Sequence, residues 1–198
     1  MNKKEREFFN SKDFLGRLRN KDSTAIEAMV MAYTEHLYRA GLGMGFNENA
    51  AKELAQNTWV SFYDAVGNFQ GNSHVRTFLF GILYNKAREL RREEAKVQKH
   101  DSIEEIMEAK FDEKGRWTHP PMEPDRFMEA SETMEIIEAC AQALPITQRS
   151  AFYLKFLEEE STPEICKILD VTVTNLGVLL YRAKNKLREC IEAKAKGM

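Results

Sequence analysis

Residues 161–187 read Ser161-Thr-Pro-Glu-Ile-Cys-Lys-Ile-Leu-Asp-Val-Thr-Val-Thr-Asn-Leu-Gly-Val-Leu-Leu-Tyr-Arg-Ala-Lys-Asn-Lys-Leu187, and this pattern predicts two helices joined by a tight turn. Ser161 and Glu164 form a capping box, with proline in the first turn, that starts a short helix. Asp170 opens the turn, because aspartate tolerates left-handed backbone, and Thr172 caps a longer helix. Its inward side carries Leu176, Leu180, Ala183, Leu187 and Ile191, and its outward side carries Arg182, Lys184, Lys186 and Arg188. This is a helix-turn-helix, whose second helix fits the DNA major groove.

Three amphipathic helices are predicted earlier in the chain. Asp22 or Ser23 caps the first, Asn47 or Asn49 caps the second, and Ser73 caps the third after a Gly-containing loop. Their apolar stripes are Ile26, Val30, Tyr33 and Leu37; Ala51, Leu54, Ala55, Thr58, Phe62 and Val66; and Val75, Phe78, Leu79, Ile82 and Leu90. We therefore predict a three-helix domain over residues 1–96.

The middle of the chain lacks a sustained apolar period. Residues 97–125 mix acidic residues with glycine and three prolines, so we predict a linker that tethers the two lobes, with one short helix around residues 103–111. A further helix ends before Pro145, and Thr147 caps the next one. Residues 126–198 then form the second domain, and the fold class is all-α with two helical domains.

Charge is segregated along this chain of net charge −2. Residues 86–99 hold six basic residues against three acidic, and residues 181–196 hold six against two. Residues 101–138 hold twelve acidic residues against four basic. Because phosphate-driven binding follows local positive charge, the two basic segments suit DNA, although the isolated protein should bind it weakly.

Several classes of function are disfavoured. Neither a signal peptide nor a membrane-spanning run is evident, so we expect a cytoplasmic protein without membrane insertion. Cys140, Cys166 and Cys190 match neither a disulfide framework nor a metal site, and we expect reduced thiols. The four histidines are isolated, and neither a phosphate-binding loop nor a nucleophile elbow occurs. We therefore expect no catalysis, cofactor, metal or small-molecule substrate, and we expect Glu158-Glu-Glu160 to be a solvated face.

Two sets of motifs resemble the extracytoplasmic-function class of bacterial sigma factors, which give RNA polymerase its promoter choice. Ala51-Lys-Glu-Leu-Ala-Gln-Asn-Thr-Trp59 resembles the family's core-binding helix, and Phe69-Gln-Gly-Asn-Ser-His-Val-Arg-Thr-Phe-Leu79 resembles its F-R-G-x-S-x-F-R-T-W-L. Ala143-Leu-Pro-Ile-Thr-Gln-Arg149 and residues 161–187 resemble its promoter-reading second lobe. The family usually has an acidic residue at the position of Asn57, so one ion pair with polymerase is in doubt.

The resemblance implies three surfaces. The residues that it implies dock on the clamp of the largest subunit of core RNA polymerase are Glu53, Leu54, Gln56, Asn57 and Trp59. Minus-ten promoter DNA falls to Asn68, Phe69, Gly71, Asn72, Ser73, Arg76, Asn85, Lys86 and Arg88. Minus-thirty-five DNA falls to Arg149, Ser161, Thr172, Thr174, Asn175, Val178, Arg182, Lys184 and Lys186. The alternatives are a solvated face with Trp59 in the core, an ordinary interhelical loop, and a charged face on a structural helix pair.

Two other functions remain open on the sequence alone. A stand-alone helix-turn-helix regulator would bind an operator without polymerase, but it explains the second lobe only. A sigma-like decoy would bind polymerase or a regulator without initiating transcription. The resemblance also implies an anti-sigma partner, for which the acidic linker is a plausible wrapping segment.

Overall fold

The computed structural model describes residues 7–97, 137 and 139–196, and every regular element in these ranges is a helix. The predicted linker and its short helix lie outside the described residues. The helices are α2 (Lys12–Arg19), α3 (Ser23–Gly43), α4 (Glu48–Ala65), the 3-10 turn η1 (Val66–Asn68), α5 (Val75–Val97), α8 (Ile146–Phe156), α9 (Thr162–Leu169) and α10 (Val173–Lys196). The all-helical prediction is confirmed, with α2 as a helix that the apolar stripes did not predict.

Side-chain caps start most of the predicted helices. The accepting side chains are Asp22 for Ala25 N–H (2.9 Å), Asn47 for Ala50 N–H (2.9 Å), Ser161 for Glu164 N–H (3.4 Å) and Thr172 for Asn175 N–H (3.2 Å). Two predicted caps are wrong. His74 Nδ1, and not Ser73, accepts the N–H of Arg76 (3.1 Å), and α8 starts at Ile146 directly after Pro145, one residue before Thr147.

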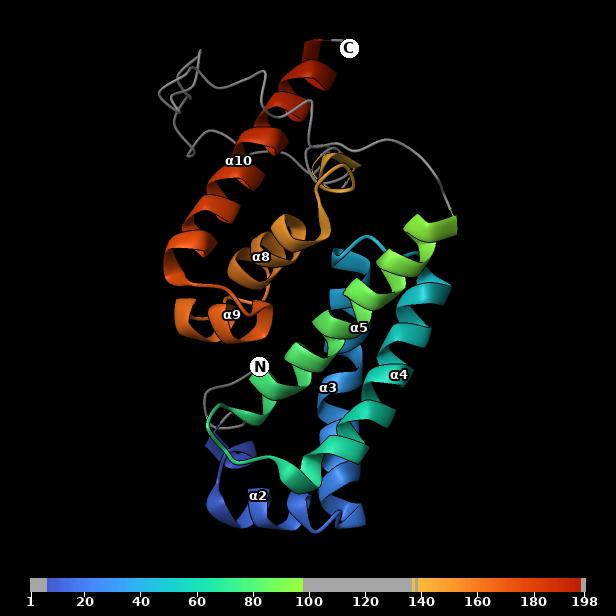
Figure 1. The fold of residues 1–198 in the computed structure, drawn as a ribbon, viewed down its shortest axis with the longest axis vertical. Helices are drawn as coiled ribbons and strands as arrows, with labels where there is room; N and C mark the ends of the chain where they lie inside the picture. Colours follow the sequence, from blue (N-terminus) through green and yellow to red (C-terminus); the bar gives the residue numbers. More distant parts are fainter. Residues whose placement is uncertain (1–6, 98–136, 138, 197–198) are drawn as a thin grey trace.

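The first lobe is a bundle of α3, α4 and α5, with α2 lying across one end (Figure 1). The predicted stripe of α4 is buried along its whole length, from Ala51 to Val66. Tyr33 and Leu37 of α3 are likewise fully buried. Hydrophobic periodicity therefore predicted the inward face of α4 correctly and that of α3 only in part, since Ile26 and Val30 are only partly buried.

The second lobe contains α8, α9 and α10 (Figure 1). Asp170 ends α9 in the left-handed conformation (φ 53°), as the predicted turn requires. Leu176, Ala183 and Leu187 of α10 are buried, so the predicted inward stripe of the long helix is confirmed there. The helix-turn-helix is formed by α9 and α10.

The two lobes pack against each other, which corrects the prediction that they are only tethered. One continuous apolar core joins residues of α3 and α5 to residues of α8, α9 and α10. Helix α5 lies between α4 on one side and α9 on the other, so it has two buried faces. Its second buried face includes Phe80, Leu83, Tyr84 and Ala87, none of which belongs to the predicted stripe.

Two of the cysteines are joined, which corrects the expectation of reduced thiols. A disulfide links Cys140, which precedes α8, to Cys190 in the last turns of α10, while Cys166 is free. The pairing was missed because the two residues are 50 positions apart, and only the packing of α10 along α8 brings them together. Cys140 is buried in a small cluster with Leu144, Ala183 and Leu187.

Candidate functional site

The outward face of α4 presents the polar residues that the sequence assigned to polymerase. Glu53, Gln56 and Asn57 are exposed, and Gln56 and Asn57 lie one turn beyond Glu53 along the helix. Leu54, assigned to the same surface, is instead buried in the core at 3% exposure. The exposed apolar residues Val60 and Tyr63 continue the surface toward the end of the helix. This face combines polar groups with apolar area, as protein-binding surfaces do.

Trp59 is half-buried, so it is neither fully exposed for polymerase nor fully part of the core, the two possibilities that the sequence allowed. Its indole N–H donates a hydrogen bond to Thr34 Oγ1 of α3 (3.1 Å), and its ring packs edge-on against Phe62. The side chain therefore contributes to the packing of α4 on α3 while one edge remains accessible.

The loop between α4 and α5 presents small polar residues over an aromatic anchor. Asn68, Gly71 and Asn72 are exposed, and Gly71 has a positive φ of 76°, which favours glycine. Phe69 is buried and stacks on Phe78, with ring centroids 4.7 Å apart. Phe69 thus holds the loop on the bundle and does not offer its ring to a base, contrary to its assignment. Ser73 is half-buried.

Arg19 at the end of α2 holds this loop, and the sequence analysis missed it. Its Nε donates a hydrogen bond to the Phe69 carbonyl (2.8 Å), across 50 residues of sequence. A Cβ at Gly71 would lie 3.2 Å from the same guanidinium. The only sequence feature that could have indicated this role is the pair of basic residues, Arg17 and Arg19, in the last turn of α2. Their contact with the loop becomes evident only in the structure, where α2 packs beside η1.

Helix α5 carries the other residues assigned to minus-ten DNA. Asn85 and Arg88 are exposed and Lys86 is partly exposed, so these three are available to a ligand. Arg76 is not, because it is buried at 3% exposure between the lobes. In this arrangement it cannot reach a phosphate, so the packed lobes do not present Arg76 to minus-ten DNA.

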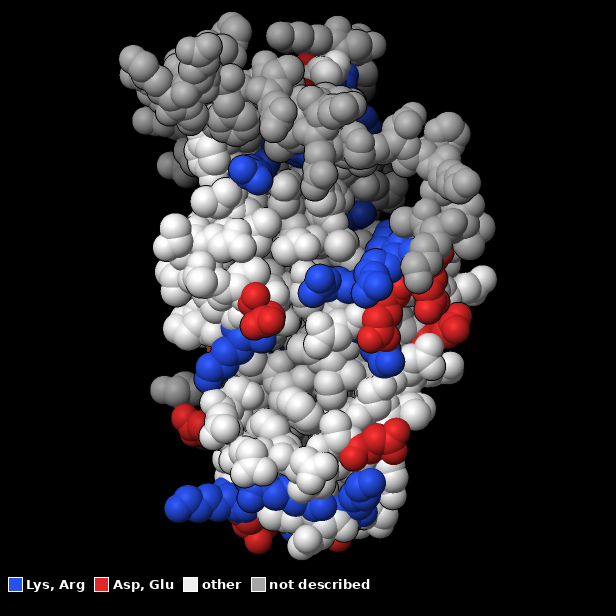
Figure 2. Space-filling view, in the orientation of Figure 1, with Lys and Arg blue, Asp and Glu red and all other residues white. Residues whose placement is uncertain are grey.

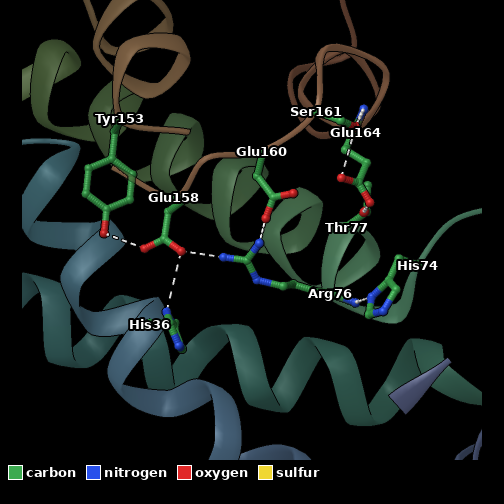
Figure 3. A network of polar contacts seen from close by, with 9 residues as sticks. All are labelled: His36, His74, Arg76, Thr77, Tyr153, Glu158, Glu160, Ser161 and Glu164. Atoms are coloured by element: carbon green, nitrogen blue, oxygen red, sulfur yellow. Dashed lines mark hydrogen bonds and ion pairs between the residues drawn. The ribbon is translucent and has the colours of Figure 1, made fainter. Parts of the chain in front are cut away.

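A polar network surrounds Arg76 (Figure 3). Its guanidinium forms ion pairs with Glu158 and Glu160, which come from the segment between α8 and α9. Both carboxylate side chains are at most 9% exposed, so the expectation that Glu158 and Glu160 form a solvated face is wrong. Only Glu159 of the three is exposed.

Two further groups complete the network on Glu158. His36 Nδ1 of α3 lies 3.4 Å from one carboxylate oxygen, and the Tyr153 hydroxyl donates to the other (2.9 Å). Burial raises the pKa of Glu158, but the contacts with His36, Arg76 and Tyr153 outweigh it and hold that pKa below its ordinary value. Burial and the negative charge of Glu158 raise the pKa of Tyr153. Glu158 is therefore a carboxylate stabilised by groups from both lobes.

The recognition helix α10 presents most of its assigned residues to solvent. Thr174, Asn175 and Val178 are exposed near its start. Thr172, just before the helix, is also exposed. Further along the helix, Arg182 and Lys184 are exposed and Lys186 is partly exposed. The side chains at the start of this helix are thus available to base edges, as a major-groove helix requires.

Two residues assigned to the same DNA surface have structural roles. Arg149 is buried, and its Nε donates a hydrogen bond to the Gly43 carbonyl of α3 (2.7 Å). Ser161 is exposed, but its hydroxyl exchanges hydrogen bonds with Glu164 in the capping box. Arg149 therefore belongs to the contact between the lobes.

Positive charge on the visible face gathers in two places (Figure 2). A row of Lys and Arg side chains crosses the end of the molecule where α2 lies, and a second group, interspersed with Asp and Glu side chains, lies over the later turns of α5. Both are close to the elements that carry the loop and the exposed residues of α5.

The comparisons match this architecture. Residues 29–97 match the model of sigma-70 region 2, and residues 134–187 match that of sigma-70 region 4. The "Probable RNA polymerase sigma factor" of Haemophilus influenzae is 31% identical over 152 residues, covering 73% of this chain and 78% of that protein. The ECF RNA polymerase sigma-E factor of Escherichia coli is 24% identical over 171 residues, covering 86% and 88%.

This chain is an extracytoplasmic-function sigma factor. A sigma factor directs transcription initiation, and the stand-alone operator-binding regulator is not favoured, since both sigma regions are present. The family is not catalytic. No helix in the described residues is long and apolar enough to cross a bilayer.

Two solved structures share the fold. CnrH in complex with the cytosolic domain of CnrY aligns with a TM-score of 0.65 at 18% identity, covering 93% of this chain and 98% of CnrH. The sigma factor RpoE in complex with the anti-sigma factor NepR from Bartonella quintana aligns with a TM-score of 0.60 at 17% identity, covering 84% and 96%.

Proposed function

We propose that this sigma factor docks on the clamp of core RNA polymerase through Glu53, Gln56 and Asn57 of α4. The observation that supports this surface is that all three are exposed on one helix face while the opposite stripe is buried. Polar groups orient a partner helix, and the neighbouring exposed Val60 and Tyr63 supply apolar area.

Promoter DNA is contacted at two positions. The loop with Asn68, Gly71 and Asn72 captures an unstacked base of the minus-ten element, and Lys86 and Arg88 hold phosphates beside it. Extruding a base costs a few kcal/mol, and stacking returns about 1 to 3 kcal/mol per base, so melting depends on the holoenzyme. Thr174, Asn175 and Val178 face minus-thirty-five base edges, with Arg182 and Lys184 near phosphates.

An anti-sigma protein is the expected regulator. CnrH and RpoE, which share the fold, are each seen bound to a second protein, a cytosolic domain of CnrY and the anti-sigma factor NepR. The acidic residues 101–120 are the proposed wrapping segment on this chain. If their deletion leaves regulator binding unchanged, that role of the linker is wrong.

Docking is tested by titrating fluorescently labelled protein with core polymerase from the source organism. We expect Glu53→Lys to weaken binding about tenfold or more, since a reversed charge at an interface costs upwards of about 1.4 kcal/mol. Glu192→Lys, at an exposed position late in α10, makes the same charge change in the other lobe and should bind normally. Trp59 is left intact because it packs on Phe62. Equal binding by both variants and wild type would remove α4 as the docking face.

A further inference from the structure

Arg76 lies at the boundary between the two lobes, where two carboxylates of the second lobe bind its side chain. It belongs to the first turn of α5 in the promoter-binding lobe, whereas Glu158 and Glu160 belong to the helix-turn-helix lobe. The three side chains are almost fully buried, and the Arg76 guanidinium also lies over the Phe80 ring, 4.7 Å from its centroid. The network therefore joins residues 82 positions apart in the chain.

Carboxylates and phosphates compete for the same arginine geometry. A guanidinium binds either group through paired N–H donors, so an arginine occupied by two carboxylates is closed to DNA phosphate. Glu158 and Glu160 thus occupy the guanidinium that a phosphate would otherwise bind. Their charge and position make them an internal competitor for the promoter.

Two more contacts place α9 on the same promoter surface. Lys167 Nζ donates a hydrogen bond to the Asn72 carbonyl in the minus-ten loop (2.9 Å), and the Thr77 hydroxyl donates to Glu164 (3.3 Å). These contacts cover the start of α5 and the adjacent end of the loop. Glu53, Gln56 and Asn57 on α4 stay exposed in the same arrangement.

We propose that Glu158 and Glu160 form an autoinhibitory latch, which keeps Arg76 from DNA in the free protein while leaving the α4 face open to polymerase. This inference rests on the proposed function for the identity of the DNA, but the latch itself is a property of the free chain. The lobes separate after polymerase docks, and promoter phosphates then replace the two carboxylates on Arg76.

Neutralising the latch should open the lobes without unfolding them. Glu158→Gln/Glu160→Gln leaves the Arg76 charge buried without a partner charge, which is strongly unfavourable. Arg76 lies at the boundary between the lobes, so their separation returns its guanidinium to water.

The test measures the distance between lobes in the full-length protein. Dyes are placed through unnatural amino acids at Met31 on α3 and Lys194 on α10, both exposed. The matched control, Glu159→Gln/Glu192→Gln, neutralises two exposed carboxylates and so has the same net charge. We expect energy transfer to fall clearly in the latch variant and to stay at the wild-type value in the control.

Binding to a short DNA duplex of arbitrary sequence, without polymerase, gives a second readout. The latch variant should bind about tenfold more tightly than the control, because apparent affinity follows the fraction of binding-competent protein. Unchanged energy transfer in a folded latch variant overturns the proposal, as does equal DNA affinity of the two variants. If circular dichroism shows that the double variant is unfolded, the single variants Glu158→Gln and Glu160→Gln are measured, and partial opening is required of them. A failure of the polymerase titration would leave the energy-transfer result standing, so the two hypotheses fail separately.

Discussion

The outward face of α4 and the start of α5 are both polar helix surfaces of the first lobe, yet only one is accessible. Glu53, Gln56 and Asn57 of α4 face solvent, whereas Arg76 and Thr77 of α5 are buried against the second lobe. The difference arises because α4 lies at the edge of the packed molecule and α5 lies in its middle. The proposed docking face on α4 is therefore open in the free protein, and the proposed contact of Arg76 with the promoter requires the lobes to separate.

Replacement of Arg76 by alanine should give the largest effect. Two buried carboxylates lose their cation, and breaking such a pair costs about 3–5 kcal/mol, so the lobes should separate. The same change removes the proposed phosphate ligand, so run-off transcription by the holoenzyme should fall while energy transfer reports open lobes. Glu158→Gln/Glu160→Gln should open equally but keep transcription. If Arg76→Ala transcribes as well as that variant, Arg76 is not a DNA ligand.

Gly43→Ala tests the packing of the lobes without changing a charge. A Cβ at this last residue of α3 would overlap the Tyr153 ring of α8, and overpacking costs about 1–3 kcal/mol. We expect a smaller loss of energy transfer than in Arg76→Ala. Gly81→Ala is the control, since nothing lies within 4 Å of its added Cβ, and it should leave the lobes closed. Equal energy transfer in both variants would mean that this contact does not hold the lobes together.

Arg19→Ala tests the loop that lies beside the buried face. Loss of the hydrogen bond to the Phe69 carbonyl, worth about 1 kcal/mol at a partly exposed site, should loosen the loop. Promoter melting by the holoenzyme, followed with permanganate, should fall several-fold, while polymerase binding is retained. Lys12→Ala at the other end of α2 should melt the promoter normally, and identical melting by the two variants would argue against a positioning role of Arg19.

Acid should open the lobes gradually, which is the smallest expected effect. The pKa of Glu158 is lowered in the closed form, so its charge stabilises closure fully above the ordinary glutamate value of about 4.3. That contribution is lost as the pH falls from there through the lowered pKa. Energy transfer measured during acidification should decrease in wild type, and Glu158→Gln should respond less. The same response in both proteins would assign the acid transition to other groups.

Several structural features that depend on local pattern were predicted correctly, whereas the caps at Ser73 and Thr147 were wrong and α2 was missed. The stripe from Ala51 to Val66, the capping box at Ser161 and the left-handed Asp170 all follow from residues within one or two helical turns. The buried face of α5 could not be predicted in this way. Phe80 and Tyr84 lie on its second stripe, and only the position of α9 shows why that stripe is apolar.

The same limit explains the errors in the predicted site. Arg76 and Arg149 are basic residues in motifs that resemble DNA-binding ones, so they were assigned to promoter DNA. Their actual partners, Glu158 and the Gly43 carbonyl, come from the other lobe and are separated by at least 82 residues in the chain. The run Glu158–Glu160 has the composition of a solvated face. Two of its side chains are buried only because they form ion pairs with Arg76 of the other lobe.

The proposed function requires that this sigma factor uses the promoter only together with polymerase. It is tested most directly by transcribing fragmented genomic DNA of the source organism with purified core enzyme, with and without the protein, and mapping RNA 5′ ends. We predict a set of start sites that share two upstream sequence elements and that appear only when the protein and the core enzyme are both present. Start sites that do not change on addition of the protein, together with protection of DNA by the protein alone, would contradict the account.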